Sequence, residues 1–122
     1  MVGVDVSGRH EEDGEYQMVA AAVHARIDST RIVSIEGMGL ASVREGPTLD
    51  AVLDLVARAV GSLPEVPSGP VVSERGEFYE EPEGTVGLHF QEEFKYVETI
   101  GERETVQAAH HAAYAARELL RR

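Results

Sequence analysis

An acidic residue interrupts an apolar run near the N-terminus. Asp5 lies within Val2-Gly3-Val4-Asp5-Val6, directly before Ser7-Gly8. This run predicts a buried strand, in which an unpaired carboxylate is costly unless a partner or a metal ion neutralises it. Asp5 is therefore the leading candidate for a catalytic and metal-binding residue. A carboxylate that only caps a turn at the end of the strand fits the same pattern.

Glu74 repeats this arrangement at the end of a second apolar run. It follows Val71-Val72-Ser73 and precedes Arg75. If the two strands are neighbours, Asp5 and Glu74 face each other, and such a pair of carboxylates has little reason to exist without a cation between them. The two acids together predict a site for Mg²⁺ or Mn²⁺. The alternative is that Glu74 is the first exposed residue after a strand and pairs with Arg75.

Three strands are predicted in the first third of the chain, over Val2–Val6, Tyr16–Ile27 and Arg31–Ile35. The second segment is long enough for a helix, but a tight turn at residues 28–30 and the β-branched residues after it favour a hairpin. Gly37 and Gly39 are expected to break or bulge the third strand.

Two helices are predicted. The first opens at Thr48 and carries apolar residues at helical spacing from Leu49 to Val60. The second covers Glu102 to Leu120 and should pack on the sheet through Val106, Ala109, Ala113, Ala116 and Leu120. Successive side chains of a helix are rotated by about 100°, which places His110 at the edge of this buried face and His111 nearly opposite it. Asp50, in the first turn of the first helix, is another acid that could bind a metal, but the helix dipole explains it equally well.

The segment between the helices is the least regular. Val71–Glu74 reads as a short buried strand, and Val86–Phe90 and Phe94–Thr99 are each predicted as strands. The expected fold class is therefore α/β. It has a mixed five-stranded sheet, built from three antiparallel strands followed by α/β crossovers, with flanking helices.

Composition narrows the class of protein. The chain has 122 residues, which predicts one domain over 1–122, and it has no cysteine, which excludes disulfides and thiolate chemistry. It shows no transmembrane run and no signal peptide, so we expect a cytoplasmic protein without membrane contact. The formal net charge is −11 and Lys95 is the only lysine, a pattern typical of halophilic archaea. No basic nucleic-acid groove is visible.

The order of elements resembles the RNase H-like superfamily, which includes RuvC-type resolvases and endonuclease V. Val2-Gly3-Val4-Asp5-Val6-Ser7-Gly8 looks like its first strand with the metal-binding Asp, and residues 71–78 are similar to the RuvC-like fourth strand, which ends in a metal-binding Glu. The matching positions are Asp5 and Glu74. The whole chain also resembles a small archaeal family found in haloarchaea and methanogens.

The resemblance implies further ligands on or near the last helix. RuvC-like enzymes place an acid in the body of that helix, where this chain has His110 and His111, and some relatives use His there. Glu102 is the metal ligand that we expect from this helix, and His110 joins Asp5 and Glu74 as a catalytic residue. Glu102 at a helix start and a half-exposed His110 also have purely structural explanations.

Two functions follow. The first is a Mg²⁺- or Mn²⁺-dependent nuclease acting on nucleic-acid phosphodiesters, with Arg9, Arg44 and Arg75 as expected phosphate contacts. The second is a non-catalytic RNase H-like module that binds a protein partner or forms a homodimer. The distance between Asp5 and Glu74 and the surroundings of His110 discriminate between them.

Overall fold

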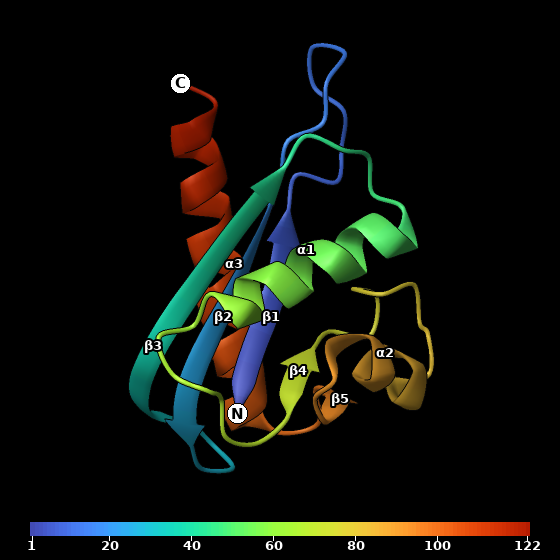
Figure 1. The fold of residues 1–122 in the computed structure, drawn as a ribbon. Coiled ribbons are helices and arrows are strands. Elements are labelled where there is room, and N and C mark those ends of the chain that lie inside the picture. The colour runs from blue at the N-terminus through green and yellow to red at the C-terminus, as the bar shows by residue number, and fades with distance from the viewer.

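The computed structural model describes residues 1–122 as five strands and three helices (Figure 1). In chain order they are β1 (Val2–Ser7), β2 (Met18–Ile27), β3 (Ile32–Val43), α1 (Leu49–Gly61), β4 (Val71–Ser73), α2 (Glu83–Phe90), β5 (Phe94–Tyr96) and α3 (Ile100–Leu120). No helix combines the length and the apolar composition that crossing a membrane requires.

The strands form one mixed sheet with the order β3-β2-β1-β4-β5. β2 pairs antiparallel with both β1 and β3, whereas β1, β4 and β5 run parallel. This confirms the predicted five-stranded mixed sheet with β1 at its centre, between β2 and β4. The pairing changes from antiparallel to parallel at β1. The carboxyl ends of β1 and β4 therefore meet at one edge, the place where open α/β sheets bind their ligands.

Alternation along β1 divides its side chains between two layers. Val2, Val4 and Val6 belong to the larger apolar core, which also contains the buried face of α1. Gly3 and Asp5 point the other way, toward α3, because successive side chains of a strand leave opposite faces. Figure 1 shows α1 and α3 on opposite sides of the sheet. The position of Asp5 in the alternation thus directs its carboxylate to the α3 layer.

Small residues let α3 lie close against the sheet. A Cβ atom built on Gly3 would lie 2.8 Å from the carbonyl carbon of Thr105. Val106, Ala109 and Ala113 are buried, as predicted for this face of the helix. Close approach of α3 to β1 brings the side chain of His110 within hydrogen-bonding range of Asp5.

The prediction for the last turn of α3 is wrong at Leu120, which is 53% exposed. Arg117 is buried instead, and its Nε donates to the carbonyl of Gln17 at 2.8 Å. β1 ends at Ser7, so this end of α3 covers the connection between β1 and β2 rather than the sheet itself.

Two other predicted elements also differ. Val86–Phe90 is not a strand but part of α2, in which Val86 is the only buried residue and Gln91 ends the helix in a left-handed conformation. A run of five largely apolar residues does not distinguish a strand from a short helix. The third strand does not stop at Ile35 but continues as β3 to Val43, with a register shift between His24 and Ala25 of β2.

Candidate functional site

Asp5 and His110 form the centre of the candidate site. Nδ1 of His110 lies 2.9 Å from Oδ2 of Asp5, and the Asp5 side chain is only 12% exposed. The His110 side chain is 53% exposed, and its Nε2 atom makes no hydrogen bond within the chain. The pair therefore has one buried, acidic end and one imidazole nitrogen open to solvent. A carboxylate at Nδ1 fixes the tautomer and the orientation of a histidine.

Glu77 is a second buried acid beside Asp5. It lies in the turn after β4, and its side chain is 7% exposed. Burial, together with the negative charge and the hydrogen bond of Asp5, raises the pKa of Glu77 to about 8, although Arg9 acts in the opposite direction. The two carboxyl groups thus share one buried region, in which they repel each other when both are ionised.

Arg9 partly neutralises this acidic pair. Its Nη2 atom lies 2.8 Å from Oε1 of Glu77 and 2.6 Å from the carbonyl oxygen of the same residue. Nη1 donates to the hydroxyl of Tyr79 at 3.2 Å, and that hydroxyl donates to the carbonyl of Pro47. Arg9 lies two residues after the end of β1, so its contacts with Glu77 join the connections that follow β1 and β4 beside the candidate site.

The sequence pattern does not point to Glu77. It sits three residues after Glu74, in a turn where no apolar periodicity indicates which side chains are buried. The available signal is its neighbour Phe78, an aromatic residue in an acidic segment that becomes fully buried in the core. A residue next to such an anchor is held close to the protein interior.

Glu74 lies on the expected face but has a different partner. Its Oε1 atom is 3.6 Å from Nη1 of Arg103, and its side chain is 41% exposed. Because Asp5 and Glu74 each contact a residue of α3, both side chains leave the same face of the sheet. Arg103 precedes His110 by seven residues, about 10 Å along a helix axis. The direct ion pair of Glu74 is thus with α3, not with a cluster around Asp5.

The structure does not bring Glu102 to Asp5. Its carboxylate accepts hydrogen bonds from the backbone N–H groups of Glu98 and Thr99, and Thr99 caps the helix in return. Oε2 of Glu102 also pairs with Lys95 at 2.9 Å. Burial alone would raise the pKa of Glu102, but these hydrogen bonds and the Lys95 charge lower it below its ordinary value. Glu102 is therefore accounted for as a capping-box residue at the start of α3.

The remaining arginines that we expected at phosphate differ in their surroundings. Arg75 lies over the ring of Tyr96, with 5.6 Å between its Cζ atom and the ring centroid. Arg44 lies at the end of β3, beside Glu15 and the C-terminal arginines. Of the three, only Arg9 contacts the buried acids.

The donor set of the candidate site is small. No group of three or more His, Asp or Glu side chains is arranged to hold a metal ion. Asp5 and Glu77 do provide two neighbouring carboxylates, the number with which proteins often hold Mg²⁺ when water and substrate phosphate complete its shell. The residues therefore fit one cation held by two acids better than a pair of cations.

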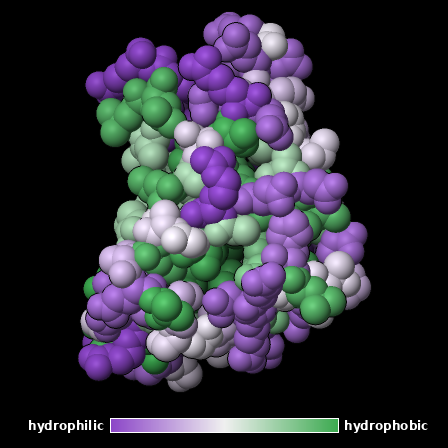
Figure 2. Space-filling model, in the orientation of Figure 1, coloured by the Kyte–Doolittle hydropathy of each residue, from purple (hydrophilic) through white to green (hydrophobic).

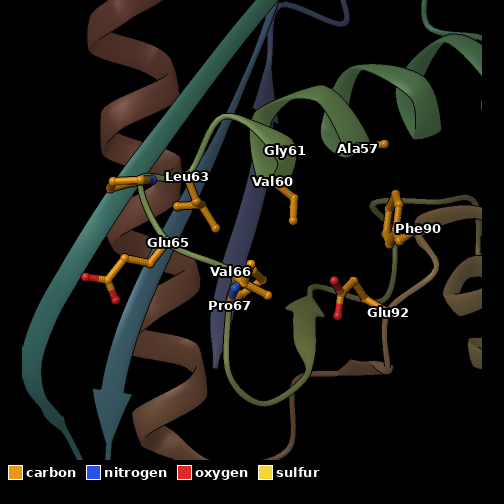
Figure 3. A pocket seen from close by; sticks show the side chains of 10 residues that line it. Ala57, Val60, Gly61, Leu63, Glu65, Val66, Pro67, Phe90 and Glu92 are labelled. Atoms are coloured by element: carbon orange, nitrogen blue, oxygen red, sulfur yellow. The ribbon is translucent and has the colours of Figure 1, made fainter.

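A separate apolar pocket lies on the α1 side of the sheet. It has a volume of about 350 Å³ and is lined by Val60, Val66, Phe90 and their neighbours from α1, the following loop and the end of α2 (Figure 3). On the same side of the molecule, exposed hydrophobic residues lie among hydrophilic ones (Figure 2). None of the lining residues belongs to the cluster around Asp5, so this pocket is distinct from the candidate site.

Comparisons with known proteins place the chain among archaeal proteins. Residues 2–121 match the family described as "Uncharacterized protein conserved in archaea (DUF2209)". The chain is also similar to the Methanocaldococcus jannaschii protein named "Uncharacterized protein MJ0095", with 31% identity over 98% of this chain and 94% of that protein. No solved structure matches the chain. With nearly its whole length matched, the chain belongs to this conserved archaeal family.

Proposed function

We propose that the protein is a divalent-metal-dependent nuclease of RNase H-like fold that acts on nucleic-acid phosphodiesters. One observation carries the proposal: two buried acids and a half-exposed histidine meet where the carboxyl ends of β1 and β4 adjoin. Buried carboxylates of this kind cluster at functional sites more often than in structural cores, because leaving them in an apolar interior is costly.

The order of the strands supports the RNase H-like fold. Three antiparallel strands come first in the chain, and two further strands extend the sheet parallel to β1. This is the arrangement that the resemblance implies, with Asp5 on the central strand. The same order supports the position of the site at the edge where β1 and β4 end.

Asp5 and Glu77 are the residues that would hold a Mg²⁺ or Mn²⁺ ion. Such an ion supplies Lewis-acid stabilisation of the negative charge on a phosphodiester. The fit rests on Glu77, an acid that is buried beside Asp5 and pairs with Arg9. Glu77 thus takes the place that the sequence assigned to Glu74, while Glu74 stays at the rim of the site with Arg103.

His110 and Arg9 supply the remaining functional groups. The carboxylate of Asp5 accepts a hydrogen bond from Nδ1 of His110, which leaves Nε2 free to accept a proton from water or to give one to a leaving oxygen. Arg9 holds Glu77 in place and limits the repulsion between the two acids. Substrate would approach from the exposed side of His110, where the imidazole is open to solvent.

The net charge of −11 sets the condition for substrate binding. A polyanion is repelled by such a chain at long range, and salt shortens that range to about 3 Å at 1 M ionic strength. We therefore expect activity to need divalent cation together with a high salt concentration. This matches the expectation of a halophilic archaeal source drawn from the composition.

The test is a cleavage assay on labelled single-stranded, duplex and branched DNA and on RNA, at high KCl with Mn²⁺, Mg²⁺ or EDTA. Wild type should cleave at least one substrate with Mn²⁺, and Asp5→Asn should lower the rate at least 100-fold. Asp54→Asn is the matched control, because Asp54 lies on α1, on the other side of the sheet. There it pairs with His89, with 2.8 Å between Oδ1 and Nε2. Absence of metal-dependent cleavage by wild type, or equal rates for wild type and Asp5→Asn, would refute the nuclease proposal.

The non-catalytic module is the second candidate function. It is favoured by the lack of a three-residue ligand cluster and by the acidic charge. In that case Asp5, Glu77 and Arg9 form a buried polar network that only joins β1 to the turn after β4. Asp5→Asn would then lower the free energy of unfolding without affecting any cleavage.

A further inference from the structure

β3 is one of the two edge strands of the sheet, and one of its faces is left open. Of its 12 residues only Glu36 is charged, and it contains no proline. Ile35, Met38 and Leu40 are 54%, 45% and 46% exposed. The register shifts of β3 begin at Glu36, so residues 37–43 keep a continuous register. An apolar edge of this length without charge or proline is a template for pairing with another strand.

The exposed apolar residues of β3 lie on the same face as α3. Leu40 pairs with Ala21, Met38 with Val23 and Ile35 with Ala25 in the β2–β3 register. Those three β2 residues pack with Ala109 and Ala113 of α3. Paired residues of adjacent strands share a face, and α3 covers their β2 partners without closing over β3. The open face therefore continues the smaller apolar cluster of the protein.

We propose that this edge is a homodimer interface, in which the β3 strands of two copies pair antiparallel around a two-fold axis at Gly39. Identical edges can pair in this way because an antiparallel ladder is symmetric about a two-fold axis. With the axis at Gly39, Met38 of each copy lies opposite Leu40 of the other. Both exposed apolar side chains then become cross-strand neighbours on one face.

The backbone of the edge suits this register. The carbonyl of Ser42 accepts a hydrogen bond from Nη1 of Arg58 at 3.2 Å, so it points away from β2. Backbone groups alternate in direction along a strand, which directs those of Met38 and Leu40 outward as well. Met38 and Leu40, which the two-fold axis places opposite each other, thus direct their backbone donors and acceptors outward, whereas the Ser42 carbonyl would exchange its bond with Arg58 for one across the interface.

Charge complementarity favours a second copy as the occupant. Glu36 and Arg44 take part in none of the ion pairs of the chain. In the proposed register Glu36 lies opposite Ser42 of the other copy, and that copy's Arg44 is the diagonal neighbour. Diagonal neighbours are about 7–8 Å apart, within reach of a long arginine side chain. The symmetry forms this pair twice, and Arg58 adds positive charge at the same place.

The test is the molecular mass in solution, measured by sedimentation equilibrium at ~0.15 M salt, where the Debye length of about 8 Å leaves close pairs unscreened. Wild type should sediment at twice the chain mass of 13.3 kDa. Glu36→Arg and Arg44→Glu should each raise the dissociation constant at least tenfold. The double variant should bring it back to within about threefold of wild type, because the pair is then restored with reversed sign.

Circular dichroism of each variant separates dimer loss from misfolding, and Glu11→Arg is a charge-reversal control on an exposed loop. The chain has no cysteine, so single cysteines can be introduced. A mixture of Met38→Cys chains and Leu40→Cys chains should be crosslinked by a short bismaleimide, whereas chains with the exposed Tyr114→Cys should not. A monomer at millimolar concentration, or a dimer that tolerates both single reversals and is not crosslinked, would overturn the proposal. The interface uses none of Asp5, Glu77, His110 and Arg9, so its failure leaves the nuclease proposal unaffected.

Discussion

Asp5 on the central strand and His110 on the last helix, 105 positions apart in the chain, are joined by a 2.9 Å contact between Oδ2 and Nδ1. The strand buries the acid, and the helix leaves the imidazole half exposed. A buried carboxylate that orients the ring and an Nε2 atom that reaches solvent are the arrangement that proposed acid–base chemistry at His110 needs.

Replacing His110 should therefore test the chemical role directly. We expect His110→Ala to lower metal-dependent cleavage by about 10²-fold or more, the usual contribution of a positioned acid–base group. His111→Ala is the comparison variant, because His111 is exposed and makes no hydrogen bond or ion pair; its ring lies edge-on to that of His110, with 5.5 Å between the centroids. Added imidazole should restore part of the rate of His110→Ala. Equal losses in both variants would show that the ring at position 110 has no chemical role.

Glu77 predicts a pH dependence of stability in the metal-free protein. Its pKa is about 8 when folded, against an ordinary value of 4.5, so the folded state binds more protons than the unfolded state between these values. Stability from the protonated Glu77 is fully present below about pH 4.5 and is lost as the pH rises through 8. Urea unfolding in EDTA should show this loss for wild type but not for Glu77→Gln.

The control for that measurement is Glu74→Gln, which removes a 41% exposed acid from the same turn and should keep the wild-type pH dependence. Mg²⁺ added at pH 8 should raise the stability of wild type more than that of Glu77→Gln, because ligand bound to the folded state stabilises it. A parallel pH dependence of wild type and Glu77→Gln would show that the acid is not held protonated.

Glu102 predicts a pH dependence of stability with the opposite sign to that of Glu77, at acid pH. Its pKa lies below the ordinary value of 4.5, so its contribution is present above pH 4.5 and is lost as the pH falls through the lowered folded value. Glu102→Gln keeps a capping group but loses the ion pair with Lys95, so it should be less stable than wild type at pH 7 and converge with it in acid. Glu104→Gln, on an exposed position of the same helix, should follow wild type.

Loss of activity in Glu102→Gln without loss of stability would revive its role as a metal ligand. Thr99→Ala removes the reciprocal half of the capping box and should cost about 0.5–2 kcal/mol in the free energy of unfolding. The two variants together separate a structural role at the helix start from a chemical one.

The sequence was most informative where burial and polarity conflict. Asp5 was predictable because it breaks an apolar run, and helical periodicity placed His110 at the edge of a buried face. Glu102 was assigned to the metal although Thr99-Ile100-Gly101-Glu102 carries the capping-box pattern of a helix start. That pattern explains the acid by local hydrogen bonds alone.

Glu77 and α2 could not be read in the same way. Glu77 is buried by the fold of a turn in which Tyr79 and Glu80 adopt positive φ values of 54° and 60°, and local composition does not specify such a path. α2 buries only Val86, so its segment carries no helical stripe. Tertiary contacts, not periodicity, fix both features.

The last prediction concerns Gly3, whose missing side chain lets α3 lie against β1. A methyl group there would lie 2.8 Å from the backbone carbon and 2.9 Å from Cγ2 of Thr105, and a helix backbone cannot rotate away as a side chain can. Gly3→Ala should cost about 1–3 kcal/mol through overpacking and should lengthen the contact between Asp5 and His110. Gly61→Ala is the control, because a Cβ atom there meets nothing within 4 Å. Thermal unfolding measures the cost, and the chemical shift of the His110 ring nitrogens reports the contact. An unchanged melting temperature together with an unchanged His110 spectrum would mean that α3 is not held at this distance by Gly3.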